Sequence, residues 1–100
     1  MAGVLVHELV DRAIAAQRAL ADLGEQVEDE WTYVNDLHEA WAARLGELAD
    51  ARGDEPVVAD SSDAIDEAIA EIGSIVDPHR AIDWLSTFPQ VVLLALGERG

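Results

Sequence analysis

The chain has 100 residues, which is the usual size of one small domain. Half of the residues are hydrophobic, so the composition is globular rather than disordered. Asp and Glu total 21 against six Arg and no Lys, giving a net charge of −15. That charge repels phosphates and anionic lipids, which argues against direct binding of nucleic acid or of a membrane surface. Cysteine is absent, so disulfides, thiolate metal sites and cysteine nucleophiles are excluded.

Targeting and membrane signals are weak. The longest uninterrupted apolar run covers only residues 91–96, far below the roughly 20 residues of a membrane span. The N-terminal segment has no basic region and reaches an acidic residue at Glu8, which is not typical of a secretory signal. We therefore expect a cytoplasmic protein without a membrane segment.

The dominant pattern of the first half is a series of apolar residues at alternating spacings of three and four. It keeps one heptad phase from residue 6 to residue 48, which is typical of a coiled coil or of a seam between packed helices. We predict that this seam, with Trp31 beside it, is an interface formed by Val6, Leu9, Ala13, Ala16, Leu20, Leu23, Val27, Glu30, Trp31, Val34, Leu37, Trp41, Arg44 and Leu48.

Gly24 is a helix breaker near the middle of this stretch, and glycine costs about 1 kcal/mol in a helix interior. It allows two interpretations: one helix over 4–51, kinked at Gly24, or a pair of helices over 4–22 and 25–51. We favour the single helix because the heptad phase continues through Gly24. Such a helix would be about 70 Å long at 1.5 Å per residue, too long for the rest of the chain to cover. The pattern therefore predicts self-association as a homodimer or a larger helical bundle.

Two polar residues, Glu30 and Arg44, interrupt the seam symmetrically about Leu37. In an antiparallel dimer that crosses near Leu37, Glu30 would approach Arg44 of the second copy. Polar seam residues often fix register and orientation in this way. The alternative is a slight rotation of the helix that leaves both side chains in solvent.

In the second half, residues 52–61 contain glycine and proline and are predicted to form a linker. Shorter helices are predicted to follow over 62–97. Ser61 or Ser62 is the predicted N-cap of a helix over 63–76, whose stripe consists of Ile65, Ile69, Ile72 and Val76.

Asp77 and Pro78 are expected to end that helix and to start another, with proline at its first position. Phe88 and Pro89 indicate a further corner before a last apolar helix over 89–96, which ends at Gly97. The predicted fold is therefore all-α: a single domain over 1–100, with a long N-terminal helix or helix pair followed by two or three shorter helices.

Candidates for chemistry are few. The three histidines, His7, His38 and His79, belong to no Glu-x-x-His, His-Glu-x-x-His or Gly-x-Ser-x-Gly motif. The least unfavourable metal ligands are Glu30, Asp36 and His38. We expect no catalytic residues, no cofactor and no metal.

The acidic residues are unevenly distributed, because segments 25–39 and 50–77 together carry −14 of the net −15. One interpretation is a solvated surface that reflects a salt-adapted host. The other is a face that attracts a basic protein partner, formed by Glu25, Glu28, Asp29, Asp36, Glu39, Asp54, Glu55, Asp63, Asp66, Glu67 and Glu71.

We therefore predict a non-enzymatic acidic scaffold or adaptor that self-associates and binds a protein with a basic face. The first alternative is an acidic inhibitor that mimics nucleic acid, such as a phage anti-defence protein or an antitoxin. The second alternative is a small metal-binding helical bundle.

Overall fold

The computed structural model describes residues 4–27, 29 and 31–97. This part of the chain contains no strand, only an isolated bridge between Leu5 and Pro56, and none of its helices combines the length and apolar character needed to cross a bilayer. The all-α prediction is confirmed: the elements are α1 (Val6–Gly24), α2 (Trp31–Arg52), α3 (Ala59–Ile72) and α4 (Pro78–Ala95).

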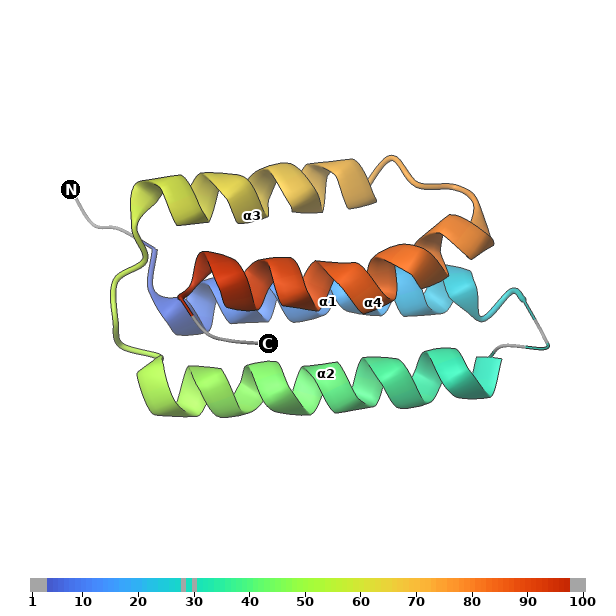
Figure 1. Cartoon of the computed structure of the whole chain (residues 1–100), viewed down its shortest axis with the longest axis horizontal. Helices are drawn as coiled ribbons and strands as arrows, with labels where there is room; N and C mark the ends of the chain where they lie inside the picture. The colour runs from blue at the N-terminus through green and yellow to red at the C-terminus, as the bar shows by residue number, and fades with distance from the viewer. Residues whose placement is uncertain (1–3, 28, 30, 98–100) are drawn as a thin grey trace.

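The helices form a flat, compact bundle. α1 and α4 make the most extensive helix–helix contact and form its centre. α2 packs on one side of this pair and α3 on the opposite side, as Figure 1 shows. The bundle measures 45 × 25 × 19 Å and has a radius of gyration of 13.3 Å, close to the value of about 13 Å expected for one compact domain of this length.

The favoured expectation of one continuous helix over 4–51 is wrong. The structure has a pair of helices, as in the alternative interpretation, but the second helix begins at Trp31 rather than at residue 25. α1 ends at Gly24, where the backbone N–H of Glu25 donates to Ala21 O at 2.9 Å. α2 then runs back along α1 (Figure 1). Gly24 is buried, and a Cβ atom there would lie 3.1 Å from Ile82 Cγ1 and 3.4 Å from Val34 Cγ1. Glycine therefore lets α2 and α4 approach the end of α1 closely.

Six members of the predicted seam are buried inside the single chain. These members on α1 and α2 join a core completed by side chains of α3 and α4, among them Val6, Leu9, Ala13, Leu20, Val34, Leu48, Ile65, Leu85, Phe88 and Val92. Folding α2 back on α1 removes both halves of the stripe from water, which is the main favourable term in folding. A second copy is therefore not needed to cover the seam.

The remaining seam positions are less buried. Ala16, Leu23, Val27, Leu37 and Trp41 are half-buried, and Arg44 is exposed. Glu28, Glu30 and the side chain of Trp31 lie outside the described residues, so the predicted pairing of Glu30 with Arg44 of a second copy stays a prediction.

The linker is shorter than predicted, because α3 begins at Ala59, and hydrogen bonds join it to the start of α1. Backbone N–H groups of Val6 and His7 donate to the carbonyls of Glu55 and Gly53 at 3.0 and 3.2 Å. These bonds satisfy amides that the first turn of a helix leaves free. Gly53 has no room for a side chain, since a Cβ atom would lie 2.3 Å from Ala49 O.

α3 begins and ends four residues earlier than predicted. Its N-cap residue is Val58 rather than a serine, and both Ser61 and Ser62 lie within its first turn. Because the helix ends at Ile72, Val76 leaves the predicted stripe and lies in the α3–α4 turn with 86% of its surface exposed.

α4 starts as predicted and then continues through the predicted corner. The Asp77 side chain caps it by accepting from the backbone N–H of His79 at 3.0 Å, and Pro78 follows at the first helical position. Pro89 removes one helical hydrogen bond, but Phe88 and Pro89 are both buried in the core. Tertiary packing keeps this stretch helical, so α4 is one helix rather than two.

Candidate functional site

The acidic side chains cover much of the surface. Every Asp and Glu in the described residues is exposed except Asp66, which is half-buried. Asp66 pairs with Arg12, and Glu55 Oε2 lies 3.2 Å from Arg52 Nε. With six arginines against 21 acidic residues in the chain, the surface has a strong negative potential.

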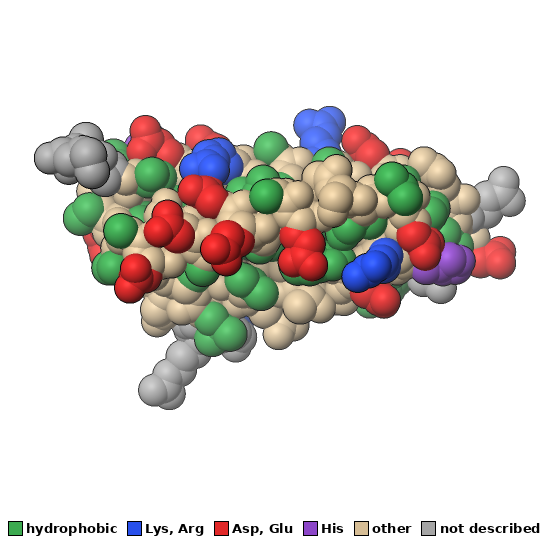
Figure 2. Space-filling model, turned by 90° about the horizontal axis from the view of Figure 1, so that it is seen from above, with side chains coloured by type: hydrophobic (Ala, Val, Ile, Leu, Met, Phe, Trp, Pro, Cys, Tyr) green, Lys and Arg blue, Asp and Glu red, His purple; other side chains and the backbone are tan. Residues whose placement is uncertain are grey.

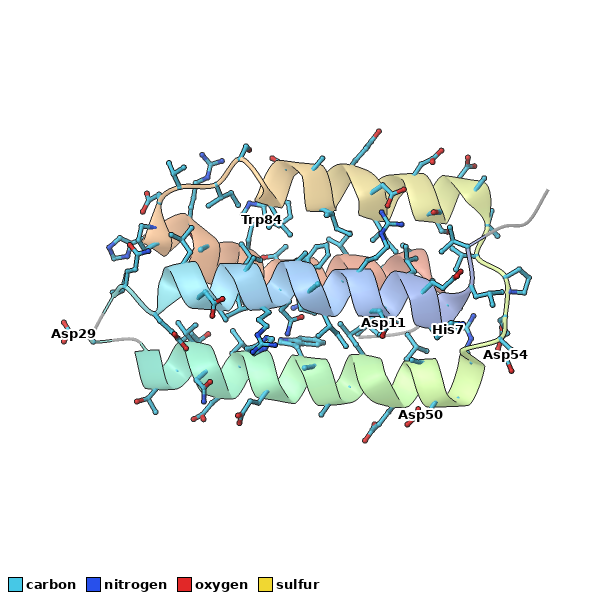
Figure 3. The ribbon with its side chains drawn as sticks, turned by 180° about the vertical axis from the view of Figure 1, so that it is seen from behind. His7, Asp11, Asp29, Asp50, Asp54 and Trp84 are labelled. Atoms are coloured by element: carbon cyan, nitrogen blue, oxygen red, sulfur yellow. The ribbon has the colours of Figure 1, made fainter. Side chains whose placement is uncertain are left out.

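The predicted acidic face is divided among separate places rather than brought together. Glu25 and Asp29 lie at the α1–α2 turn, whereas Asp54 and Glu55 lie in the loop that follows α2. Figure 3 shows Asp29 at one end of the bundle and Asp54 at the other. The helical members lie on opposite sides of the bundle: Asp36 and Glu39 on α2, and Asp63, Asp66, Glu67 and Glu71 on α3. Glu28 is outside the described residues.

One group of acids forms a ridge along α3. We call Asp60, Asp63, Glu67 and Glu71 the α3 ridge; all four are exposed and follow one another at spacings of three and four residues. Figure 2 looks down on this side of the bundle and shows acidic side chains spread along the molecule, with apolar and a few basic side chains among them. The spacing places successive carboxylates about 4.5–6 Å apart along the helix axis.

A hollow lies between α2 and α4. This α2–α4 groove has a volume of about 580 Å³ and is lined by Ala40, Ala43, Arg44, Glu47, Leu48, Ala51 and Leu93. Five of these seven residues are apolar, and the guanidinium of Arg44 lies 5.8 Å from the ring centroid of Trp41. The groove was not among the predicted sites, although its α2 wall follows a second stripe at heptad spacing that the sequence displays.

A smaller apolar patch lies where α3 passes into α4. The exposed Val76 and the half-buried Ile75 and Trp84 line a hollow of about 220 Å³ together with Arg80. Trp84 therefore packs against the core and also lines this surface hollow.

The histidines do not form a chemical site with one another. His7 is on α1, His38 on α2 and His79 on α4. His38 is held by Gln17 of α1, whose Nε2 donates to His38 O at 3.0 Å and lies 3.2 Å from His38 Nδ1. The Oε1 atom of Gln17 is buried without a hydrogen-bond partner.

Of the three residues named as the least unfavourable metal ligands, the two that the structure describes are not directed at a common point. Asp36 is exposed, while His38 turns towards α1 and contacts Gln17; Glu30 is outside the described residues. Within the described ranges, no group of three or more His, Asp or Glu side chains is placed to hold a metal ion.

Comparison with known proteins adds no functional information. No family model, curated protein or solved structure shows a significant match to the chain.

Proposed function

We propose that this chain is a non-enzymatic acidic adaptor that binds a protein partner through a basic face of that partner. The observation that carries this proposal is the exposure of nearly all described carboxylates on a compact domain with few cations. Such a surface attracts a basic protein over long range and accelerates its association at low salt.

The arrangement of the polar groups favours binding over catalysis. General acid–base or nucleophilic chemistry needs a base within hydrogen-bond reach of its partner and held by a third group. The contacts described for His38 instead join it to the buried Gln17 amide, and the Asp77 side chain serves as the cap of α4.

Self-association remains a separate prediction and needs a different surface from the one first expected. Leu9, Leu20 and Leu48 of the seam are buried inside one chain, so the seam offers little to a second copy. A dimer would have to use exposed apolar side chains such as Tyr33, Val76 and Leu94.

Salt-dependent binding of a labelled, lysine-rich peptide tests the proposed function. Fluorescence anisotropy at ionic strengths of about 0.01 M and 0.15 M compares Debye lengths of about 30 and 8 Å. We expect binding at the lower salt and at least about tenfold weaker binding at the higher salt. A glutamate-rich peptide of equal length is the control. Equal affinity for both peptides, or no binding of the basic peptide at low salt, would contradict the proposal.

The α3 ridge favours mimicry of nucleic acid as a second candidate function. Its regular carboxylates offer a basic cleft a row of negative charges, as a phosphate backbone does. A basic nuclease with a fluorescent DNA substrate distinguishes the two functions. Mimicry predicts inhibition that is lost in a variant with Asp60→Asn, Asp63→Asn, Glu67→Gln and Glu71→Gln, whereas an adaptor leaves cleavage unchanged.

A further inference from the structure

The α2 wall of the α2–α4 groove has the pattern of a helix-docking surface. Two interleaved sets of residues, each seven apart, make a stripe along α2: Tyr33, Leu37, Ala40, Arg44, Glu47 and Ala51. The last four of these line the groove. Leu37 is half-buried and the other five are exposed. Spacing of this kind places side chains on one face against a neighbouring helix. Of the described helices, α4 borders this face of α2 through Leu93, and the exposed side chains of the stripe leave the rest of the face uncovered.

The shape of the groove suits a helix. Ala40, Ala43 and Ala51 are small, so the backbone of a neighbouring helix can approach to the 8–10 Å typical of helix pairs. Leu48 and Leu93 are buried beneath them and provide an apolar floor. Leu94, the next residue of α4, leaves 69% of its surface exposed. The stripe from Tyr33 to Ala51 is about 27 Å long at 1.5 Å per residue, which matches a partner helix of about five turns.

The negative charge beside the groove favours a basic partner over a second copy of this chain. Asp36, Glu39, Glu47 and Asp50 are exposed along the outer side of α2, and Figure 3 shows Asp50 on that side, away from the bundle. Arg44 is the one cation among the residues that line the groove, and it lies over the Trp41 ring. A second copy would bring another net charge of −15 to this rim, whereas a basic helix would bring opposite charges to it.

We propose that the α2–α4 groove binds an amphipathic α-helix of a basic protein partner. The apolar face of the partner helix lies on Ala40, Ala51 and Leu93. The Lys and Arg side chains of that helix face the four carboxylates on the outer side of α2. This is the helix-in-groove mode of recognition. The assignment rests on the function proposed above and names its site and its class of partner.

Two synthetic peptides of about 18 residues, a length set by the stripe from Tyr33 to Ala51, test the assignment. One carries Leu at heptad positions and Lys elsewhere, and the other has the same composition in scrambled order. The variant Ala40→Gln with Ala51→Gln fills the groove with longer side chains and leaves the charge unchanged. Ala64→Gln with Ala70→Gln is the matched control, because it alters two exposed alanines of α3. Gln replaces Ala on helix surfaces at little cost, and far-UV circular dichroism checks the fold of both variants.

We expect the ordered peptide to bind at least about tenfold more tightly than the scrambled one, a difference of about 1.4 kcal/mol. The groove variant should lose about that factor and the control variant should retain its affinity. NMR chemical-shift changes in the wild-type protein should be confined to α2 and α4, which keeps the test decisive even if a variant misfolds.

Three results would overturn the groove assignment. Equal binding of both peptides, with the groove variant behaving as the control variant does, would show that the groove is not the binding site. The proposed function as an acidic adaptor would still stand. Chemical-shift changes centred on α3 would move the site to the α3 ridge. A homodimer that occupies the groove and is not displaced by the ordered peptide would identify a second copy as the occupant. Failure of both peptides to bind at low salt would instead contradict the adaptor function itself.

Discussion

Replacing Gln17 by Met is expected to stabilise the protein. Gln17 is 0% exposed and lies between α1 and α2, where its Nε2 donates to His38 O while Oε1 has no partner. An unsatisfied buried acceptor costs about 1–3 kcal/mol, whereas a typical hydrogen bond contributes about 1 kcal/mol net. Met has a similar size and shape, and it removes the unsatisfied acceptor together with the bond.

The expected balance is a gain of about 1 kcal/mol in the free energy of unfolding, or a rise of about 4–8 °C in Tm for a domain of this size. Loss of the hydrogen bond from Gln17 leaves no new buried group unsatisfied. His38 O lies within α2, where it can accept a helical hydrogen bond, and the His38 ring is only half-buried. By contrast, Gln17→Glu places a carboxylate at the same position and should destabilise the fold by about 3 kcal/mol or more.

Urea unfolding followed by circular dichroism measures these differences. Gln26→Met is the matched control: Gln26 is exposed in the α1–α2 turn, so its replacement should change stability by no more than about 0.5 kcal/mol. If Gln17→Met lowered the free energy of unfolding by more than about 1 kcal/mol, the view of Gln17 as a net cost to the fold would be refuted.

Three further predictions follow from the fold. Leu20→Asp places a carboxylate at a buried position of the former seam and should abolish the helical circular dichroism signal; a folded variant of reduced oligomeric mass would show instead that Leu20 lies between chains. Phe88→Ala should lower the free energy of unfolding by about 3–5 kcal/mol in urea, since Phe88 is fully buried within α4. Asp77→Ala should cost about 1 kcal/mol in thermal unfolding, because it removes the cap to the backbone N–H of His79.

The sequence by itself determined the fold class and part of the core. Heptad spacing over residues 6–48 identified Leu9, Leu20 and Val34 as buried, and the pair Asp77–Pro78 correctly marked the start of α4. These features are local, since they depend on side-chain periodicity and on the capping of a helix end. The net charge of −15 likewise set the kind of partner worth testing.

Only the tertiary structure decided where the helices end and which surface stays free. The same stripe would serve one long helix or two packed helices, and the close approach of Ile82 and Val34 to Gly24 belongs to the folded-back arrangement. Packing of Phe88 and Pro89 into the core keeps α4 continuous despite a proline. A periodic pattern tells which side chains leave water but not which element covers them. For that reason the α2–α4 groove became visible only once α1 and α4 had taken the other faces.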